Sequence, residues 1–164
     1  MSALVRVPEG AITATLGAIQ RAGEGRRESA AFWIGRADTL VVDTVVLPLG
    51  DGVSCQPRSL RLSETWMVAL AALCERRDAV VLAAVHAHPD EAFFSPVDRD
   101  AFFHAPDCVS IVLPSYGYTS TADAEARWAV FVGLPRNGWV RRRWQDVVDI
   151  VGGRAELVEL EASC

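Results

Sequence analysis

The chain has 164 residues, of which 51% are hydrophobic and 23% charged, and a formal net charge of −5. This length and apolar content fit one domain with a substantial core and argue against disorder. A net negative charge argues against nucleic-acid binding, because proteins that bind nucleic acids usually carry an excess of basic residues. The uninterrupted apolar runs, such as residues 66–74 and 79–85, are too short to span a bilayer. We therefore expect a single domain over residues 1–164 that binds neither nucleic acid nor membranes.

Two further features of the composition bear on location and partners. The first residues form no charged segment followed by an apolar signal core, so we expect a cytoplasmic protein. The four cysteines form no Cys-x-x-Cys pair and match no zinc-ribbon spacing, and a cytoplasmic protein usually keeps such thiols reduced. The sixteen basic residues are all arginine, and codon bias in a GC-rich genome is the simpler explanation for the missing lysine.

Hydrophobic periodicity predicts a helix and a hairpin in the first part of the chain. Residues 12–19 place apolar side chains at i, i+4 and i+7 between Pro8 and Gly23, which predicts a first helix. Residues 29–34 and 39–47 are β-branched and aromatic and enclose a short turn, which predicts two paired strands.

The rest of the chain continues this mixture of elements. Residues 49–57 are rich in glycine and predict a loop, whereas residues 59–77 carry a helical stripe of apolar side chains. Residues 80–85 predict a strand buried on both faces. Further strands are expected at residues 108–113, 127–133, 139–144 and 155–160. The pattern predicts an α/β (α+β) layered domain rather than a regular βαβ array.

The most informative residues follow the buried strand. His86 and His88 stand at i and i+2 at its end, and Asp98 follows ten residues after His88. Side chains at i and i+2 of a strand project to the same face, so both imidazoles can converge on one metal ion. Two histidines and one carboxylate leave the fourth position of a tetrahedral zinc site open for water, as in catalytic sites.

Simpler interpretations of these residues exist. Paired histidines at a strand end are often only polar residues at a rim. Ser95, Pro96 and Asp98 also form a good helix start, with Ser as N-cap, Pro in the first turn and an acid three residues after the cap. The two interpretations are compatible, because a helix N-terminus can hold Asp98 rigidly toward the histidines.

This array resembles the JAMM signature of JAB/MPN metalloproteases: an upstream Glu, then His-x-His-Pro, then Ser-x-x-Asp. Residues 86–89 match the first block and residues 95–98 the second. In many members the glutamate opens a strand of the form Glu-x-Cys-Gly-Leu-Leu-Leu-Gly, and Glu28 and Gly35 match its two ends. The resemblance covers roughly residues 8–114 and implies a JAB/MPN-type domain, a cytidine-deaminase-like sandwich of a mixed curved sheet flanked by helices.

The sequence departs from the family pattern in two places. His88 and Ser95 enclose six residues, where the family usually has seven, which indicates a loop shortened by one residue, while the spacing from Ser95 to Asp98 is intact. The usual Cys-Gly after the glutamate is replaced by Ala30 and Ala31, which should pack similarly.

The resemblance implies a role for each matched residue. His86, His88 and Asp98 would hold Zn²⁺, which activates water and polarises the scissile carbonyl. Glu28 would accept the proton of the water and deliver it to the leaving amine. Ser95 would donate a hydrogen bond to the oxyanion.

Other residues carry weaker signals. Glu24 is a lesser competitor for the role of base, and His104 is more often a surface or satisfied histidine than a further ligand. Residues 141–143, three arginines, suggest a solvated strand end or a contact for an acidic partner. Phe93 and Phe94 belong either to the core or to a substrate channel.

Related zinc enzymes fit less well. Nucleoside deaminases need His-x-Glu and a downstream Pro-Cys-x-x-Cys, but the second position here is His88 and the second cysteine is missing after Cys108. Metallo-β-lactamase-type hydrolases need His-x-His-x-Asp-His, whereas Glu91 stands in the last position.

The expected activity is therefore that of a bacterial, deubiquitinase-like zinc isopeptidase. The resemblance implies cleavage after the C-terminal glycine of a ubiquitin-like protein, in deconjugation or precursor processing, with E1- and E2-like enzymes as further partners, including in anti-phage defence. Release of cysteine or another small adduct from a sulfur-carrier protein is an alternative. A non-catalytic MPN scaffold is another, although such proteins typically lose members of the motif.

Overall fold

The computed structural model of the chain describes residues 4–101 and 104–162. The strands are β1 (Val5–Pro8), β2 (Ala30–Gly35), β3 (Val42–Leu49), β4 (Val53–Gln56), β5 (Ser59–Leu62), β6 (Val80–Ala87), β7 (Val109–Leu113), β8 (Ala129–Leu134), β9 (Gly138–Arg142), β10 (Val148–Val151) and β11 (Glu156–Glu161). The helices are α1 (Glu9–Gly23), α2 (Glu64–Arg76), α3 (Pro96–Ala101), α4 (Ala124–Arg127) and α5 (Trp144–Val147).

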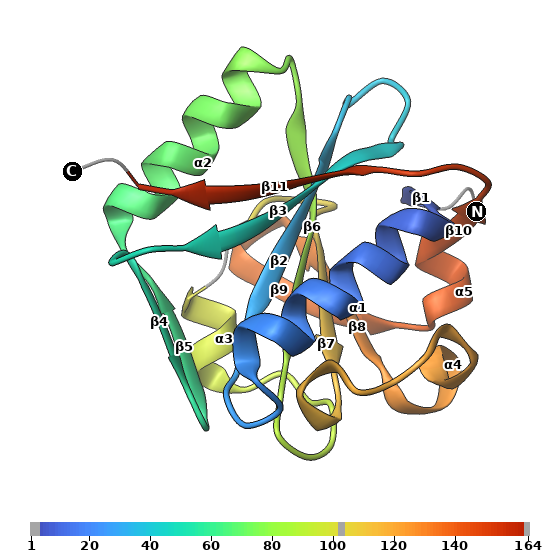
Figure 1. Ribbon diagram of the computed structural model, residues 1–164. Coiled ribbons are helices and arrows are strands. Elements are labelled where there is room, and N and C mark those ends of the chain that lie inside the picture. The colour runs from blue at the N-terminus through green and yellow to red at the C-terminus, as the bar shows by residue number, and fades with distance from the viewer. Residues whose placement is uncertain (1–3, 102–103, 163–164) are drawn as a thin grey trace.

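A mixed seven-stranded sheet in the order β11-β3-β2-β6-β7-β8-β9 forms the centre of the fold (Figure 1). The pairs β11–β3 and β6–β7 are parallel, and the other neighbours are antiparallel. Two small sheets, β1–β10 and β4–β5, lie beside it. The predicted α/β layered class is confirmed. No helix in the described ranges is long and apolar enough to cross a membrane.

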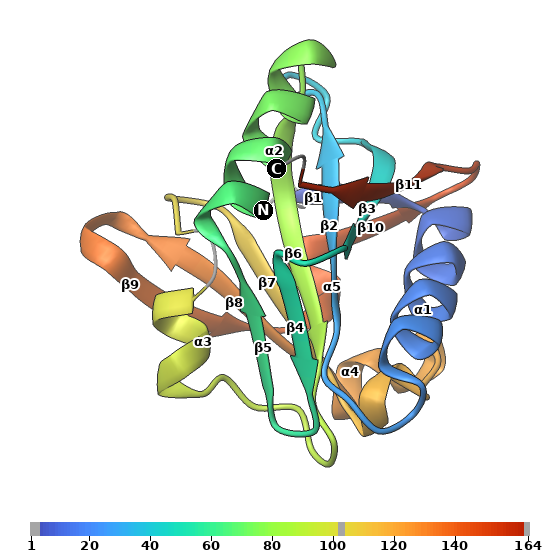
Figure 2. The same cartoon turned by 60° about the vertical axis from the view of Figure 1, so that its left-hand side comes forward.

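Helices cover both faces of the sheet (Figure 2). On one face, Ile19 of α1 and Trp33 of β2 belong to a buried cluster that also includes β1, β10 and α5. On the other face, Trp66 of α2 packs against Phe32 of β2 with ring centroids 5.3 Å apart. A smaller cluster around Phe94, just before α3, continues this second face over β7 and β8. Strand β6 is therefore buried on both sides from Leu82 onward, as predicted, whereas Val80 at its start is exposed.

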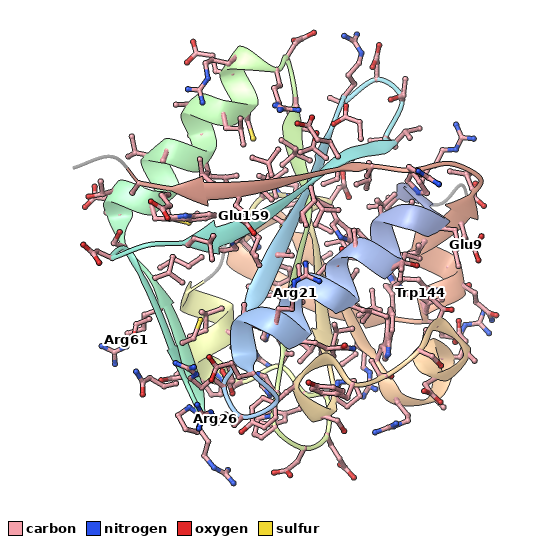
Figure 3. The ribbon with its side chains drawn as sticks, viewed as in Figure 1. Glu9, Arg21, Arg26, Arg61, Trp144 and Glu159 are labelled. Atoms are coloured by element: carbon pink, nitrogen blue, oxygen red, sulfur yellow. The ribbon has the colours of Figure 1, made fainter. Side chains whose placement is uncertain are left out.

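Helix α1 shows why the apolar spacing in the sequence predicts its position. Ile12 is buried against the sheet, whereas the charged residues Glu9 and Arg21 lie on the exposed side (Figure 3). The helix begins after Pro8 and ends where Glu24 adopts a left-handed conformation with φ of 51°.

Most predicted elements are confirmed to within a few residues, but two predictions are wrong. Residues 49–57, expected to form a loop, contain β4, and residues 59–77, expected to form one helix, begin with β5. Helix α2 starts only at Glu64, because the Ser63 hydroxyl accepts the backbone N–H of Trp66 at 3.1 Å and caps the helix.

One irregularity interrupts the pairing of β2 with β6. Trp33 pairs with Ala83, but the next residue, Ile34, pairs with Val81, so Leu82 is an extra residue on β6. Leu82 and Ala83 both belong to the cluster on the α1 side. This is a β-bulge, in which one strand accommodates an additional residue and twists more strongly.

Candidate metal centre

Two histidines stand at the end of β6, on the face of the sheet that carries α2 and α3. His86 lies in register with Ala30 of β2 and Val112 of β7. His88 lies just beyond the strand and donates its backbone N–H to the carbonyl of Leu113 at 2.9 Å. The two residues are only 1% and 3% exposed, and their ring centroids are 5.1 Å apart. Both imidazoles therefore border the same buried space.

Asp98, in the first turn of α3, completes the group. Its Oδ1 lies 3.4 Å from Nε2 of His86, and its Oδ2 lies 3.3 Å from Nε2 of His88. One ligand atom from each residue can be chosen so that all three lie within 4.8 Å of one another. Ligands of tetrahedral zinc, with bonds of about 2.0–2.2 Å, are separated by about 3.3 Å. The three predicted ligands thus come together, and their donor types, burial and spacing allow them to bind a metal ion.

The surroundings favour the protonation states that a metal requires. Burial lowers the pKa of His86, which favours the neutral imidazole. Burial alone raises the pKa of Asp98, but hydrogen bonds with His86 and His88 and with the backbone of Ser95 outweigh it, and the net pKa lies well below its usual range. Because metals bind neutral imidazole and ionised carboxylate, both shifts favour coordination.

Ser95 and Asp98 form a capping box at the start of α3. The Ser95 hydroxyl oxygen accepts the backbone N–H of Asp98 at 3.1 Å, and Asp98 Oδ2 accepts the backbone N–H of Ser95 at 2.8 Å. The capping interpretation is therefore confirmed, and it coexists with the placement of Asp98 beside the histidines. The cap uses a lone pair of the Ser95 hydroxyl and leaves its hydrogen able to donate.

Glu28 reaches the same edge of the sheet from β2. The β2–β6 ladder continues beyond both strands, because the backbone N–H of Ala87 donates to the carbonyl of Ser29 at 3.0 Å. The last pair of the ladder is Ala30 with His86, and the same register extended by two residues brings Glu28 opposite His88. Facing Cβ atoms of such a pair are about 5 Å apart. The Glu28 side chain is only 7% exposed. Burial raises its pKa above the usual value, and the nearby charge of Asp98 adds to the rise.

The two phenylalanines before α3 have different environments. Phe94 is buried and stacks on Phe131 with ring centroids 4.6 Å apart, so it belongs to the core. Phe93 is 56% exposed and meets the ring of His88 edge-on, with centroids 4.6 Å apart. Phe93 is therefore a largely exposed apolar side chain that lies against the ring of one candidate metal ligand.

The weaker candidates lie elsewhere. The ring Nε2 of His104 lies 2.9 Å from the carbonyl oxygen of Gly138, outside the group of three ligands. Glu24 is exposed and pairs with Arg26 at 2.6 Å on the surface.

The loop expected after β7, at residues 114–125, begins with a turn that supports the histidine segment. The backbone N–H groups of Ser115 and Tyr116 donate to the carbonyls of Asp90 at 3.0 Å and of His88 at 2.7 Å. Pro114 and Gly117, which has φ of 84°, are sequence signals for a turn, but they do not indicate which segment the turn contacts.

Comparisons with known proteins bear on the fold. No protein-family profile matches the chain, and no curated protein matches it. A protein of Desulfitobacterium hafniense solved in solution is similar with a TM-score of 0.62 and 15% identity, over 92% of this chain and 94% of that one. A JAB1/MPN domain protein from Archaeoglobus fulgidus gives a TM-score of 0.44 and 15% identity, over 92% and 100%. The first comparison shows a shared fold only, and the second score is too low to establish one.

Proposed function

We propose that the protein is a zinc-dependent isopeptidase of the JAB/MPN kind, which cleaves after the C-terminal glycine of a ubiquitin-like protein. The observation that carries this proposal is the buried group of His86, His88 and Asp98 with Glu28 opposite His88. A buried carboxylate with a raised pKa beside a candidate metal group is the arrangement expected of a general base.

Each residue then has a defined task in peptide hydrolysis. When bound, zinc supplies Lewis acidity, which activates water and polarises a carbonyl at neutral pH. Glu28 accepts a proton from the attacking water and passes it to the amine nitrogen as the C–N bond breaks. Ser95 donates a hydrogen bond from its hydroxyl to the oxyanion that forms on the carbonyl.

The surroundings of the group support an extended tail as substrate. The β4–β5 hairpin lies beside α3 in both views of the ribbon (Figures 1 and 2). In the described ranges, β5 pairs only with β4, so its other edge can accept an extended segment. Because the three ligands are 6% exposed or less, little room remains for a side chain beside the scissile bond. This supports glycine at that position.

The absence of lysine fits a place beside ligation enzymes. E1- and E2-like enzymes of a bacterial conjugation system, such as one used in anti-phage defence, attach a ubiquitin-like protein to amines. A chain with no lysine offers them only its N-terminal amine. Incubation with such enzymes, before and after surface lysines are introduced, tests this; equal modification of both forms would favour codon bias.

Metal analysis and one cleavage assay test the proposed activity. The purified protein should contain about one zinc per chain and release the fused partner from a ubiquitin-like protein after its terminal glycine. Glu28→Ala should keep the metal and lose cleavage. Loss of metal in Glu28→Ala, or full activity in His86→Ala, would contradict the proposal. A fusion left intact while a cysteine adduct of a sulfur carrier is hydrolysed would indicate adduct release instead.

A further inference from the structure

The chain leaves β7 through a turn with an uncommon backbone. Ser115, Tyr116 and Gly117 have φ angles of 54°, 53° and 84°. The left-handed region is sterically unfavourable for L-residues, so Ser115 and Tyr116 adopt it only where the surroundings compensate. Non-glycine residues with positive φ cluster at functional sites, so the contacts of this turn can indicate a functional role.

The backbone of the turn is bound to the segment that carries the histidines. Ser115 and Tyr116 donate their N–H groups to the carbonyls of Asp90 and His88, at 3.0 Å and 2.7 Å. Both left-handed residues thus make backbone hydrogen bonds beside the three candidate ligands, and these bonds hold the backbone of Tyr116 next to the histidine segment.

The side chain of Tyr116 connects this segment to the β4–β5 hairpin. Its hydroxyl donates to the carbonyl of Pro57, at the tip of the hairpin, at 3.0 Å. Next to the tip, the carbonyl of Gln56 accepts the backbone N–H of Glu28 at 2.8 Å. Leu60 is the only fully buried residue of the two strands, and Val53, Cys55 and Leu62 pack against the same cluster. At the tip itself, the other contact with the histidine segment is an exposed ion pair between Arg58 and Asp90 at 3.8 Å, which contributes little. An isolated two-stranded hairpin is marginally stable in water, so a bond at its tip matters.

We propose that Tyr116 is a positioning residue. Its hydroxyl holds the tip of the β4–β5 hairpin beside the segment that carries the histidines, residues 86–90, before substrate binds. An ordered hairpin reduces the entropy lost when an extended tail pairs with it, so the tether acts on binding of the tail rather than on bond cleavage. The role in substrate binding rests on the proposed function; the tether itself does not.

Tyr116→Phe tests the tether, because it removes the hydroxyl and keeps the ring. Tyr118→Phe is the matched control: Tyr118 lies two residues further on, is 56% exposed, and its hydroxyl has no hydrogen bond within the described ranges. Amide hydrogen exchange of residues 53–62 in the full chain should become about fivefold faster in Tyr116→Phe, as expected for the loss of one hydrogen bond. Tyr118→Phe should exchange like the wild type.

A kinetic measurement tests the consequence. With a fusion to a ubiquitin-like protein, Tyr116→Phe should raise KM about fivefold and leave kcat within about twofold, with unchanged zinc affinity. Equal exchange in Tyr116→Phe and wild type, or faster exchange with an unchanged KM, would overturn the proposal. A loss of kcat together with a loss of zinc affinity would also overturn it, because Tyr116 would then act by supporting the histidines rather than the hairpin. The exchange measurement needs neither metal nor substrate, so it decides the tether even if no cleavage occurs.

Discussion

Ser95 and Asp98 bind each other's backbone: the Ser95 hydroxyl accepts the Asp98 N–H at 3.1 Å, and the Asp98 carboxylate accepts the Ser95 N–H at 2.8 Å. One carboxylate oxygen thus serves the helix cap while the carboxylate also faces both histidines. The side chain of Asp98 is consequently oriented before any metal binds, which lowers the entropy that coordination must overcome.

Substitution of Ser95 separates its two roles. Alanine removes both the cap and the hydroxyl, so we expect a loss of about 1 kcal/mol in stability and a fall in kcat of roughly 10²–10³. Glycine also lacks the hydroxyl but costs only a few tenths of a kcal/mol as an N-cap. Urea unfolding should therefore separate the two variants while kcat falls equally in both. A Ser95→Gly enzyme with normal kcat would show that the hydroxyl acts only as a cap.

Substitution of Glu28 should stabilise the metal-free protein while it abolishes activity. The pKa of Glu28 is raised by burial, so its charged form is disfavoured in the folded state, and this group lowers stability as pH rises above its unfolded pKa of about 4.5. Glu28→Gln removes the charge and should raise Tm at pH 7 in the presence of a chelator. We expect kcat to fall about 10²–10⁴-fold. An unchanged or lower Tm would contradict the electrostatic account of this residue.

Asp98→Asn tests the metal group without removing the helix cap. The amide oxygen of asparagine can still accept the Ser95 N–H, but it lacks the charge that favours metal coordination. For the wild type, zinc at 100 times its Kd should add about 2.7 kcal/mol to stability. Thermal unfolding with and without a chelator should show this gain in the wild type and little of it in Asp98→Asn. An equal gain in both would place the metal elsewhere.

The contribution of His86 to the stability of the metal-free protein should fall as the pH drops from 7 to 5. Burial lowers the pKa of His86 below 6.5 in the folded state, so the unfolded chain binds more protons at this residue as the pH falls through 6.5. For one such group, the slope of the free energy of unfolding against pH should approach about 1.4 kcal/mol per pH unit. Asp98, whose pKa is lowered, adds a further loss below about pH 4. The free energy of unfolding, measured with urea at several pH values between 7 and 5, should change less steeply with pH in His86→Gln than in the wild type. Equal slopes would contradict a lowered pKa of His86.

Gly117→Ala tests whether the turn after β7 requires glycine. A Cβ at this position would lie 2.7 Å from Cγ2 of Ile19, and φ is 84°. We expect a loss of roughly 1–3 kcal/mol in stability, measured by urea unfolding. Gly152→Ala is the control, because nothing lies within 4 Å of its added Cβ. A loss as large in the control would indicate a general effect of alanine rather than a requirement at residue 117.

Local patterns in the sequence predict the site better than the fold around it. His86 and His88 follow from strand alternation, and Ser95 and Asp98 from the signature of a helix N-cap, so each pair needs only its neighbours to be predicted. The position of Glu28 opposite His88 depends instead on the register between two strands, which only the family resemblance suggested in advance.

The elements that were predicted wrongly or missed depend on distant contacts. Residues 59–62 extend the apolar stripe of α2, and nothing local shows that they pair with β4. Strands β1 and β10 come from opposite ends of the chain and pair in parallel, with Val5 opposite Val148. Such pairing is decided by tertiary packing, which overrides local propensity.

The extra residue on β6 has a consequence for how the strand tolerates changes in length. Leu82 has no partner on β2, while the residues on either side of it keep theirs. Loss of Leu82 would cost a buried side chain but would preserve the alternation of the strand. Loss of Ala84, between this point and the histidines, would turn His86 and His88 toward α1. In related chains, single-residue deletions within β6 are therefore expected at the bulge and nowhere closer to the histidines.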